Sequence, residues 1–118
     1  MITGRRAALA AVLDAVDGVQ GRTQRPGTPR VGDGWATWRG GERAGGDNFL
    51  QSWQVIIVLP GDLSGDAGLA WLDQHLGDVF EALEHSEAGG YVESVAPISL
   101  AVGDNGTMPA VQIMIRTE

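Results

Sequence analysis

The sequence predicts one α+β domain, in which two helices pack on one face of a mostly antiparallel sheet of about four strands. Three observations support this fold class. Residues 48–60 form the longest apolar run of the chain, as in a strand at the centre of a sheet. Two other segments repeat apolar residues every three to four positions, as amphipathic helices do, and each is followed by segments typical of hairpins. At 118 residues, the chain is long enough for a single core.

The expected central strand runs from Asn48 to Pro60. Its first half alternates apolar and polar residues, whereas Val55–Val58 is apolar on both sides and rich in β-branched residues, which favour strands. Pro60 cannot donate a backbone hydrogen bond and Gly61 is free to turn, so these two residues end the strand. The strand should therefore begin half-exposed and finish inside the core.

The first helix is expected between Thr3, a suitable N-cap, and Gly18, a suitable C-terminal stop. Its apolar residues recur at i, i+3, i+4 and i+7, which places on one face Leu9, Val12, Leu13 and Val16. The paired arginines before this segment resemble a twin-arginine export signal, but Asp14 and Asp17 interrupt the apolar stretch and argue against one. No run of about 18 apolar residues occurs, so no transmembrane span is predicted.

Residues 21–47 are predicted to form a long, flexible, glycine-rich hairpin arm. They contain eight glycines, two prolines and five arginines but few aliphatic side chains, so a helix is excluded. Short strands are expected at Val19–Thr23 and Trp35–Arg39, with a mobile hairpin loop at Gly40–Gly46. A long glycine-rich segment on a small domain is commonly ordered by a partner, so we expect this arm to become ordered on assembly.

A second helix is expected from about Ala67 to His85, with Ser64 or Asp66 as its N-cap. At 100° per residue, six side chains form its core-facing stripe: Leu69, Leu72, Leu76, Val79, Phe80 and Leu83. Trp71 lies outside this stripe, on the side that carries His75, Asp78 and Ala82. Two interpretations of Trp71 follow: it packs beneath the loop before the helix, or it anchors a contact between subunits, where tryptophan is enriched.

Two hairpin-connected strands follow the second helix. Tyr91–Val102 has apolar residues at most even positions, and Pro97 within it indicates an edge strand or a bulge. Gly103–Gly106 is expected to be the turn. In Thr107–Arg116, the alternation points three side chains inward: Val111, Ile113 and Ile115.

Charge is distributed unevenly along the chain. All eight basic residues are arginines and seven of them lie in residues 1–43, whereas ten of the fifteen acidic residues lie in residues 62–118. The formal net charge of −7 disfavours a general nucleic-acid-binding surface. The basic part of one copy can face the acidic part of another, although a solvated acidic surface explains the same charges. The chain has no cysteine, which excludes disulfides and thiolate metal sites.

No catalytic, cofactor or metal site is predicted, and the chain is expected not to be an enzyme. The segment Gly32–Gly34 lacks the other features of a phosphate-binding loop, and His75 and His85 lack the spacing of zinc ligands. Asp62–Asp66 resembles the start of a calcium loop, but Ala67 occupies the position that needs glycine. None of the serines lies in a nucleophile motif.

Several segments together resemble the tail terminator proteins of long-tailed phages that infect actinobacteria. They are the N-terminal helix Arg5–Val19, the segment Pro29–Trp35, the strand Trp53–Pro60, the acidic helix after it, and the ending Val111–Glu118. The resemblance covers nearly the whole chain, residues 1–118, as one domain. It rests on the order and size of the elements and not on a catalytic motif. The arginine-only, alanine- and glycine-rich composition also fits a high-GC host.

The resemblance implies an α+β fold similar to the terminator of lambda-like phages and a structural role in the virion. In that family, copies form a hexameric ring that caps the last ring of the tail tube, stops its polymerisation and presents the surface to which the filled head attaches. The implied partners are the major tail tube protein and a head-completion or neck protein, while DNA passes through the lumen without specific binding. Assembly would take place in the host cytoplasm, and the ring would lie at the head-proximal end of the tail.

The residues expected at contacts between subunits or with the tube are Trp35, Trp38, Arg39 and Arg43 on the arm, and Trp71, His75 and Asp78 on the second helix. The acidic second half would face the lumen, where like charge repels DNA, or a neighbouring arm. Two other functions stay open. One is another phage neck protein, such as a head-completion protein, and the other is a small cytoplasmic α+β domain that dimerises through a sheet edge and binds a ligand or peptide.

Overall fold

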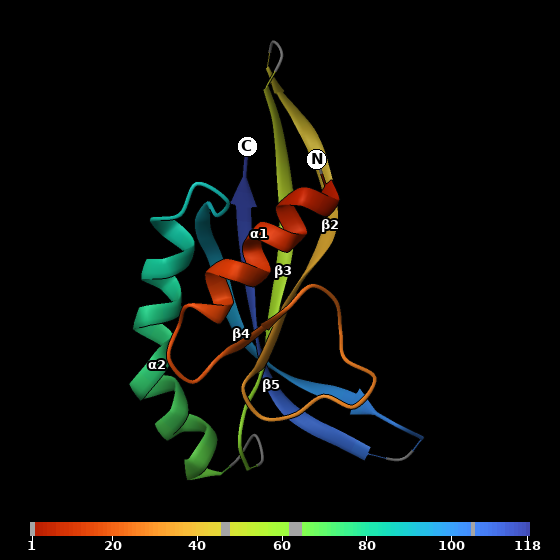
Figure 1. Ribbon diagram of the computed structural model, residues 1–118, viewed down its shortest axis with the longest axis vertical. Helices are drawn as coiled ribbons and strands as arrows, with labels where there is room; N and C mark the ends of the chain where they lie inside the picture. Colours follow the sequence, from red (N-terminus) through yellow and green to blue (C-terminus); the bar gives the residue numbers. More distant parts are fainter. Residues whose placement is uncertain (1, 46–47, 62–64, 105) are drawn as a thin grey trace.

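The computed structural model describes residues 2–45, 48–61, 65–104 and 106–118. It is an α+β domain with two helices and one five-stranded sheet, in the chain order α1 (Ile2–Asp14), β1 (Gln20–Arg22), β2 (Asp33–Gly45), β3 (Asn48–Val58), α2 (Asp66–Glu84), β4 (Tyr91–Val102) and β5 (Gly106–Thr117). Neighbouring strands in the sheet follow the order β1-β2-β3-β5-β4. Both helices lie on the same face of the sheet, as predicted (Figure 1).

The sheet has one strand more than the expected four, and it is mixed. β1 occupies the place of the short strand expected at Val19–Thr23, but it pairs in parallel with β2. The other three pairs of neighbouring strands are antiparallel. The parallel pair arises because the connection 23–32 carries the chain back along β1 before β2 begins, which a hairpin turn cannot do.

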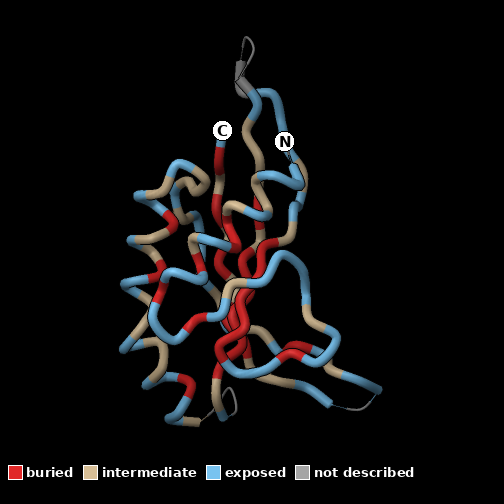
Figure 2. The backbone as a smooth tube through the Cα atoms, viewed as in Figure 1, coloured by how far each residue is buried: buried red, intermediate tan, exposed pale blue. Residues whose placement is uncertain are grey.

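The main core lies between the helices and the sheet. β3 occupies the centre of the sheet, as predicted, and its side chains Trp53, Val55 and Ile57 are fully buried. Ile113 and Ile115 of β5 lie beside them, so the inward alternation predicted for this strand is confirmed. Figure 2 shows the buried residues concentrated along the middle of the sheet, whereas both of its ends are exposed.

A second, smaller core lies on the opposite face of the sheet. Trp35 and Ile56 are partners across β2 and β3, and they pack with Leu100 and Ala110 of the β4–β5 hairpin. Figure 1 shows the far halves of β4 and β5 swinging away from the direction of β3, toward the side on which the connection 23–32 lies. The second core therefore includes the apolar even positions in the far half of β4, Ile98, Leu100 and Val102, whereas Val92 near the start of the strand packs against the main core.

A bulge in β4 explains this change of face. Val92 is the partner of Ile115, which faces the helices, but Glu93 is an extra residue, and Ser94 pairs with Met114 on the opposite face. β4 has the predicted bounds and is an edge strand, as Pro97 indicates. β5 extends one residue beyond its predicted range at each end.

Both helices begin and end at residues other than those predicted. α1 includes Thr3 and stops at Asp14, so Thr3 is not its N-cap. The chain nevertheless turns at Gly18, where φ is 84° and glycine is favoured. α2 begins at Asp66, which is therefore a helical residue and not the N-cap, while Ser64 lies outside the described residues.

The buried side of α2 is rotated by roughly 40° from the predicted stripe, toward Trp71. Val79 and Leu83 are fully buried, but Leu69 is 57% exposed and Trp71 packs, partly buried, against the main core. The predictions that Leu69 belongs to the core and that Trp71 lies off it are therefore wrong. The rotation arises because α2 packs against α1 as well as against the sheet, and periodicity within one helix does not reveal a neighbouring helix.

The hairpin loop predicted at Gly40–Gly46 is wrong for residues 40–45, which continue β2. β2 stays paired with β3 as far as Gly45, with two register shifts. A Cβ at Gly41 would lie 2.3 Å from the ring of Phe49 and 2.9 Å from the backbone carbonyl oxygen of Leu50, so glycine is favoured at this point of the strand. Residues 46 and 47 lie outside the described residues, and the flexibility expected of residues 21–47 stays a prediction.

Polar contacts hold the connection 23–32 against the domain. Asp33, which is buried, accepts hydrogen bonds from Arg22 Nε at 3.1 Å and from the backbone N–H of Arg30 at 2.9 Å. The guanidinium of Arg25 donates to the carbonyl of Ala101 in β4. Two of the arginines in the predicted arm therefore bond within the chain.

None of the helices in the described ranges is long and apolar enough to span a membrane.

Candidate interaction surfaces

The β2–β3 hairpin extends past the main core as a distal hairpin, defined here as residues 39–45 and 48–52 (Figure 1). Arg43 and Phe49 lie directly opposite each other in its register, so their side chains share one face. Both are exposed, and Phe49 shows 50% of its surface to solvent. Arg39 is also exposed, and so is Trp38 at the base. Aromatic and guanidinium groups together are typical of protein contacts.

Arg116 of β5 fixes the distal hairpin relative to the sheet. Its Nη1 donates to Glu42 Oε1 at 3.0 Å, and its Nε lies 2.8 Å from Glu93 Oε1. The Nε–H does not point at the Glu93 carboxylate closely enough for a hydrogen bond, so that contact is an ion pair. Because both carboxylates remain in contact with water, each pair adds about 1 kcal/mol or less to stability. Arg116 therefore orients β2, β4 and β5 more than it stabilises them.

An apolar groove of about 210 Å³ lies between α2 and the edge strand β4. Its lining, which we call the α2–β4 groove, consists of Leu59, Gly68, Leu69, Leu72, Val95, Ala96, Pro97 and Val111. Two of its members are exposed large side chains, namely Leu69 and Val95. Exposed apolar side chains gathered around a hollow mark a contact surface more often than apolar residues scattered singly.

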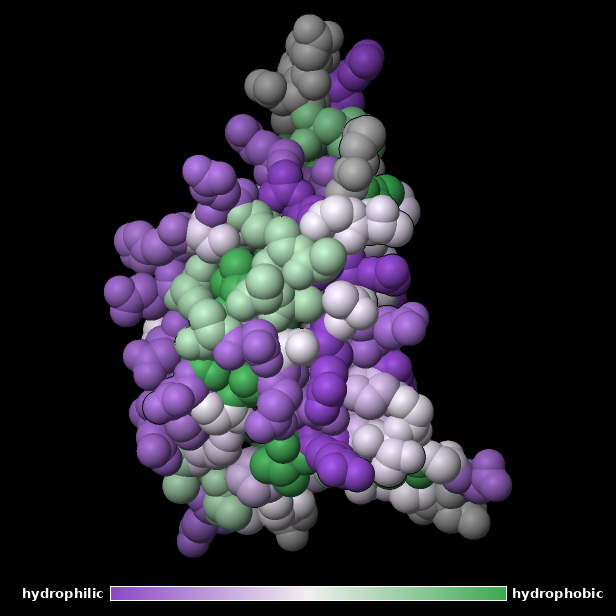
Figure 3. Space-filling model, viewed as in Figure 1, coloured by the Kyte–Doolittle hydropathy of each residue, from purple (hydrophilic) through white to green (hydrophobic). Residues whose placement is uncertain are grey.

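The outer side of α2 is acidic. The helix carries five exposed carboxylates and neither arginine nor lysine: Asp66, Asp73, Asp78, Glu81 and Glu84. Figure 3 shows this hydrophilic side in purple along the left edge of the molecule. Asp66 and Asp73 lie three residues before and four residues after Leu69, so all three side chains share one side of the helix. The α2–β4 groove therefore has an acidic rim.

Trp71 and His75 pack together at the start of α2, with ring centroids 4.6 Å apart and ring planes at 42°. A Cβ at Gly18 would lie 2.8 Å from Cε1 of His75, so the imidazole rests on the turn between α1 and β1. Both side chains are only partly exposed, whereas Asp78 is exposed. These contacts favour packing within the chain for Trp71. An additional role at a subunit contact stays a prediction.

The seven residues predicted at contacts do not form one surface. Three of them lie on or beside the distal hairpin, namely Trp38, Arg39 and Arg43, and three lie on α2, namely Trp71, His75 and Asp78. Trp35 is 2% exposed in the second core, so its side chain is not available to a partner without rearrangement.

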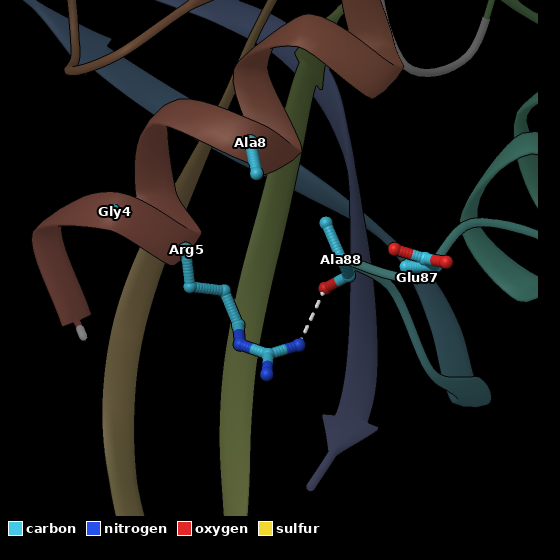
Figure 4. A pocket seen from close by; sticks show the side chains of 5 residues that line it. All are labelled: Gly4, Arg5, Ala8, Glu87 and Ala88. Atoms are coloured by element: carbon cyan, nitrogen blue, oxygen red, sulfur yellow. Dashed lines mark hydrogen bonds between the residues drawn. The ribbon is translucent and has the colours of Figure 1, made fainter.

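A hollow of about 360 Å³ lies between α1 and the connection from α2 to β4. Figure 4 shows Arg5 reaching from α1 toward the carbonyl of Ala88, to which Nη1 donates at 2.8 Å. Its Nη2 donates to the carbonyl of Glu118 at 2.7 Å. Arg5 therefore fastens the end of β5 and the α2–β4 connection to α1, which is a structural role.

Within the described ranges, no three His, Asp or Glu side chains gather as metal ligands. The stretch weighed as a calcium loop, Asp62–Asp66, lies partly outside the described residues. The absence of catalysis and of cofactors stays a prediction.

Comparisons with protein-family models, with curated proteins and with solved structures find no match for this chain. The resemblance to tail terminators therefore rests on the sequence features given above.

Sequence reasoning misses three surface residues that the fold brings into view: Phe49, Leu69 and Val95. Phe49 and Val95 belong to segments correctly predicted as strands, and both are paired within the sheet, but nothing in the alternation shows that their side chains are left exposed. For Leu69 a signal exists in the sequence, because carboxylates stand on both sides of it at helical spacing.

Proposed function

We propose that this protein is a tail terminator, a structural virion protein that caps the tail tube as a ring, ends tube polymerisation and forms the surface for head joining. The resemblance in the order and size of its elements supports this proposal, and an α+β domain with two helices on one face is compatible with it. DNA would pass through the lumen without specific binding, since an acidic lining repels its phosphates.

The observation that carries the proposal is that one chain presents two unlike surfaces. The distal hairpin combines exposed apolar and basic side chains, whereas the α2–β4 groove combines apolar and acidic ones. Contacts between unlike surfaces of identical subunits are heterologous, and they close into rings when the rotation between neighbours divides a full turn. The number six comes from the resemblance alone.

A ring of this kind needs neither turnover nor a nucleotide, because its free energy comes from surface burial. A contact of standard size covers about 800 Å² on each partner. A ring subunit has two neighbours, so such contacts would cover roughly a quarter of the chain's 6673 Å². The rest of the surface stays available to the tail tube protein and the neck protein.

Electron microscopy of particles made without this protein tests the function. We expect tube subunits to keep adding past the normal stop and filled heads to remain unjoined, and restoring the gene should restore both. Tails of normal length that fail to join heads would instead identify another neck protein. Normal tails already joined to heads would exclude both roles.

A further inference from the structure

We propose that Arg43 and Phe49 of one copy dock on the α2–β4 groove of the next copy, with Phe49 against Leu69. Arg43 would then face the carboxylates of Asp66 and Asp73. The partner is therefore a second copy of this chain. The inference rests on the ring proposed above, but it concerns one contact and can fail independently of the ring's function.

The apolar side chain of the distal hairpin and the apolar hollow of the α2–β4 groove match in chemical character and in size. Phe49 is half exposed on the distal hairpin, where neither helix covers it, and Leu69 and Val95 stand exposed around a hollow of about 210 Å³. An aromatic side chain that fills an apolar pocket is the usual anchor of a protein contact. Docking would remove three exposed apolar side chains from water at once.

The charged parts match in sign and in spacing. Arg43 lies beside Phe49 on the hairpin, and Asp66 and Asp73 lie on either side of Leu69 along α2. Each surface therefore has an apolar centre with charge next to it, basic on one and acidic on the other. Two copies of the same surface would bring like charges together, so the pairing of unlike surfaces is favoured.

The distal hairpin is also oriented before it docks. Arg116 joins Glu42 of the hairpin to Glu93 of β4, which limits how far the hairpin moves relative to the sheet. A surface already held in its docking orientation loses less entropy on association.

Two substitutions, a truncation of Phe49 and an exchange of Leu69 for a charged side chain, test the apolar centre by sedimentation velocity of the intact chain at low salt. Phe49→Ala and Leu69→Asp should each weaken self-association by about 30-fold or more, as a central anchor does. Leu69→Asp should still fold, because residue 69 is exposed in the first turns of a helix, where acidic side chains are tolerated. The matched control is Tyr91→Ala, which removes a side chain of similar exposure outside both surfaces and should leave association unchanged.

Charge reversal tests the pairing itself. Arg43→Glu should repel the acidic rim of its own copies, and Asp73→Arg should repel their hairpins, so each variant alone should associate at least about tenfold more weakly. An equimolar mixture should assemble again, because the hairpin of each variant then meets an oppositely charged groove on the other. The mixed species should contain the two chains in equal amounts.

A mixture that associates no better than its components would overturn the proposal, and so would unchanged association of Phe49→Ala and Leu69→Asp, or a chain that stays monomeric at millimolar concentration. The tail-length experiment is independent of these results. If the mixture assembles but tails made without the gene are normal, the contact stands and the terminator function fails. If Phe49→Ala and Leu69→Asp leave both association and tail length normal, the function stands and the contact fails.

Discussion

Leu69 and Trp71 exchange the roles that helical periodicity assigns to them, and two substitutions test this exchange. The predicted stripe includes Leu69 and excludes Trp71, whereas in the fold Leu69 is 57% exposed and Trp71 packs against the main core and His75. If the packing is correct, Trp71→Ala must destabilise the single chain more than Leu69→Ala does. The periodicity alone predicts the reverse order.

The expected magnitudes follow from burial. Truncating a fully buried tryptophan to alanine costs about 3–5 kcal/mol, and because Trp71 is only partly buried we expect about 2–3 kcal/mol. Full burial of a leucine is worth about 1.5–3 kcal/mol, so with more than half of Leu69 in water we expect about 1 kcal/mol or less. The free energies of unfolding of the two variants should therefore differ by about 1.5 kcal/mol.

Urea unfolding followed by far-UV circular dichroism measures both variants, at protein concentrations low enough to keep the chain monomeric. The two variants should unfold with the same dependence of free energy on urea, so that the midpoints compare directly. A Leu69→Ala variant that is less stable than Trp71→Ala would refute the packing of α2. A Trp71→Ala variant with unchanged monomer stability but weaker assembly would return Trp71 to the role of an inter-subunit anchor.

Three further predictions concern the start of the chain and the connection to β2. Gly21→Ala should lower the free energy of unfolding in urea by about 3 kcal/mol or more, because its Cβ would lie 1.9 Å from the carbonyl oxygen of Ala10. The control Gly27→Ala, whose Cβ would meet no atom within 4 Å, should cost little. Equal costs would contradict the packing of β1 on α1. Asp33→Ala should cost about 1–3 kcal/mol, since it leaves the backbone N–H of Arg30 without its acceptor, and an unchanged unfolding midpoint would exclude that contact. Hydrogen exchange should show amides in residues 21–47 gaining protection on assembly, and equal protection in the free and assembled chain would remove the expectation of a flexible arm.

The strands that lie in the main core are the best predicted part of the fold. β5 alternates clearly, and β3 is apolar on both sides from Val55 to Val58, so the buried positions Val55, Ile57 and Ile113 are placed correctly from the sequence. β2 is predicted poorly because its glycines read as a loop. At Gly41 glycine is instead favoured because a Cβ would approach the ring of Phe49 and the backbone oxygen of Leu50, neighbours on the adjacent strand that the local sequence does not reveal.

Features set by a neighbouring element are also invisible to periodicity. The bulge at Glu93 places the later apolar even positions of β4, Ile98, Leu100 and Val102, in the second core, and no residue type in the sequence identifies the bulge. The rotation of α2 depends on where α1 lies. Of the candidate contact residues, Arg39 and Arg43 are exposed, whereas Trp35 is buried because the β4–β5 hairpin crosses its face of the sheet.

The position of Arg116 links the fold to the proposed assembly. Its two ion pairs lie at the surface and add little stability. One joins β5 to its backbone partner β4, and the other reaches across β3 to Glu42 of β2, a strand with which β5 does not pair. The main effect of Arg116 is therefore on the orientation of the distal hairpin. This hairpin carries the exposed side chains Phe49 and Arg43. A hairpin free to swing could reach many surfaces weakly, whereas a fixed one can reach the next copy at only one angle. A fixed angle between neighbours is what decides whether heterologous contacts close into a ring or continue as a filament.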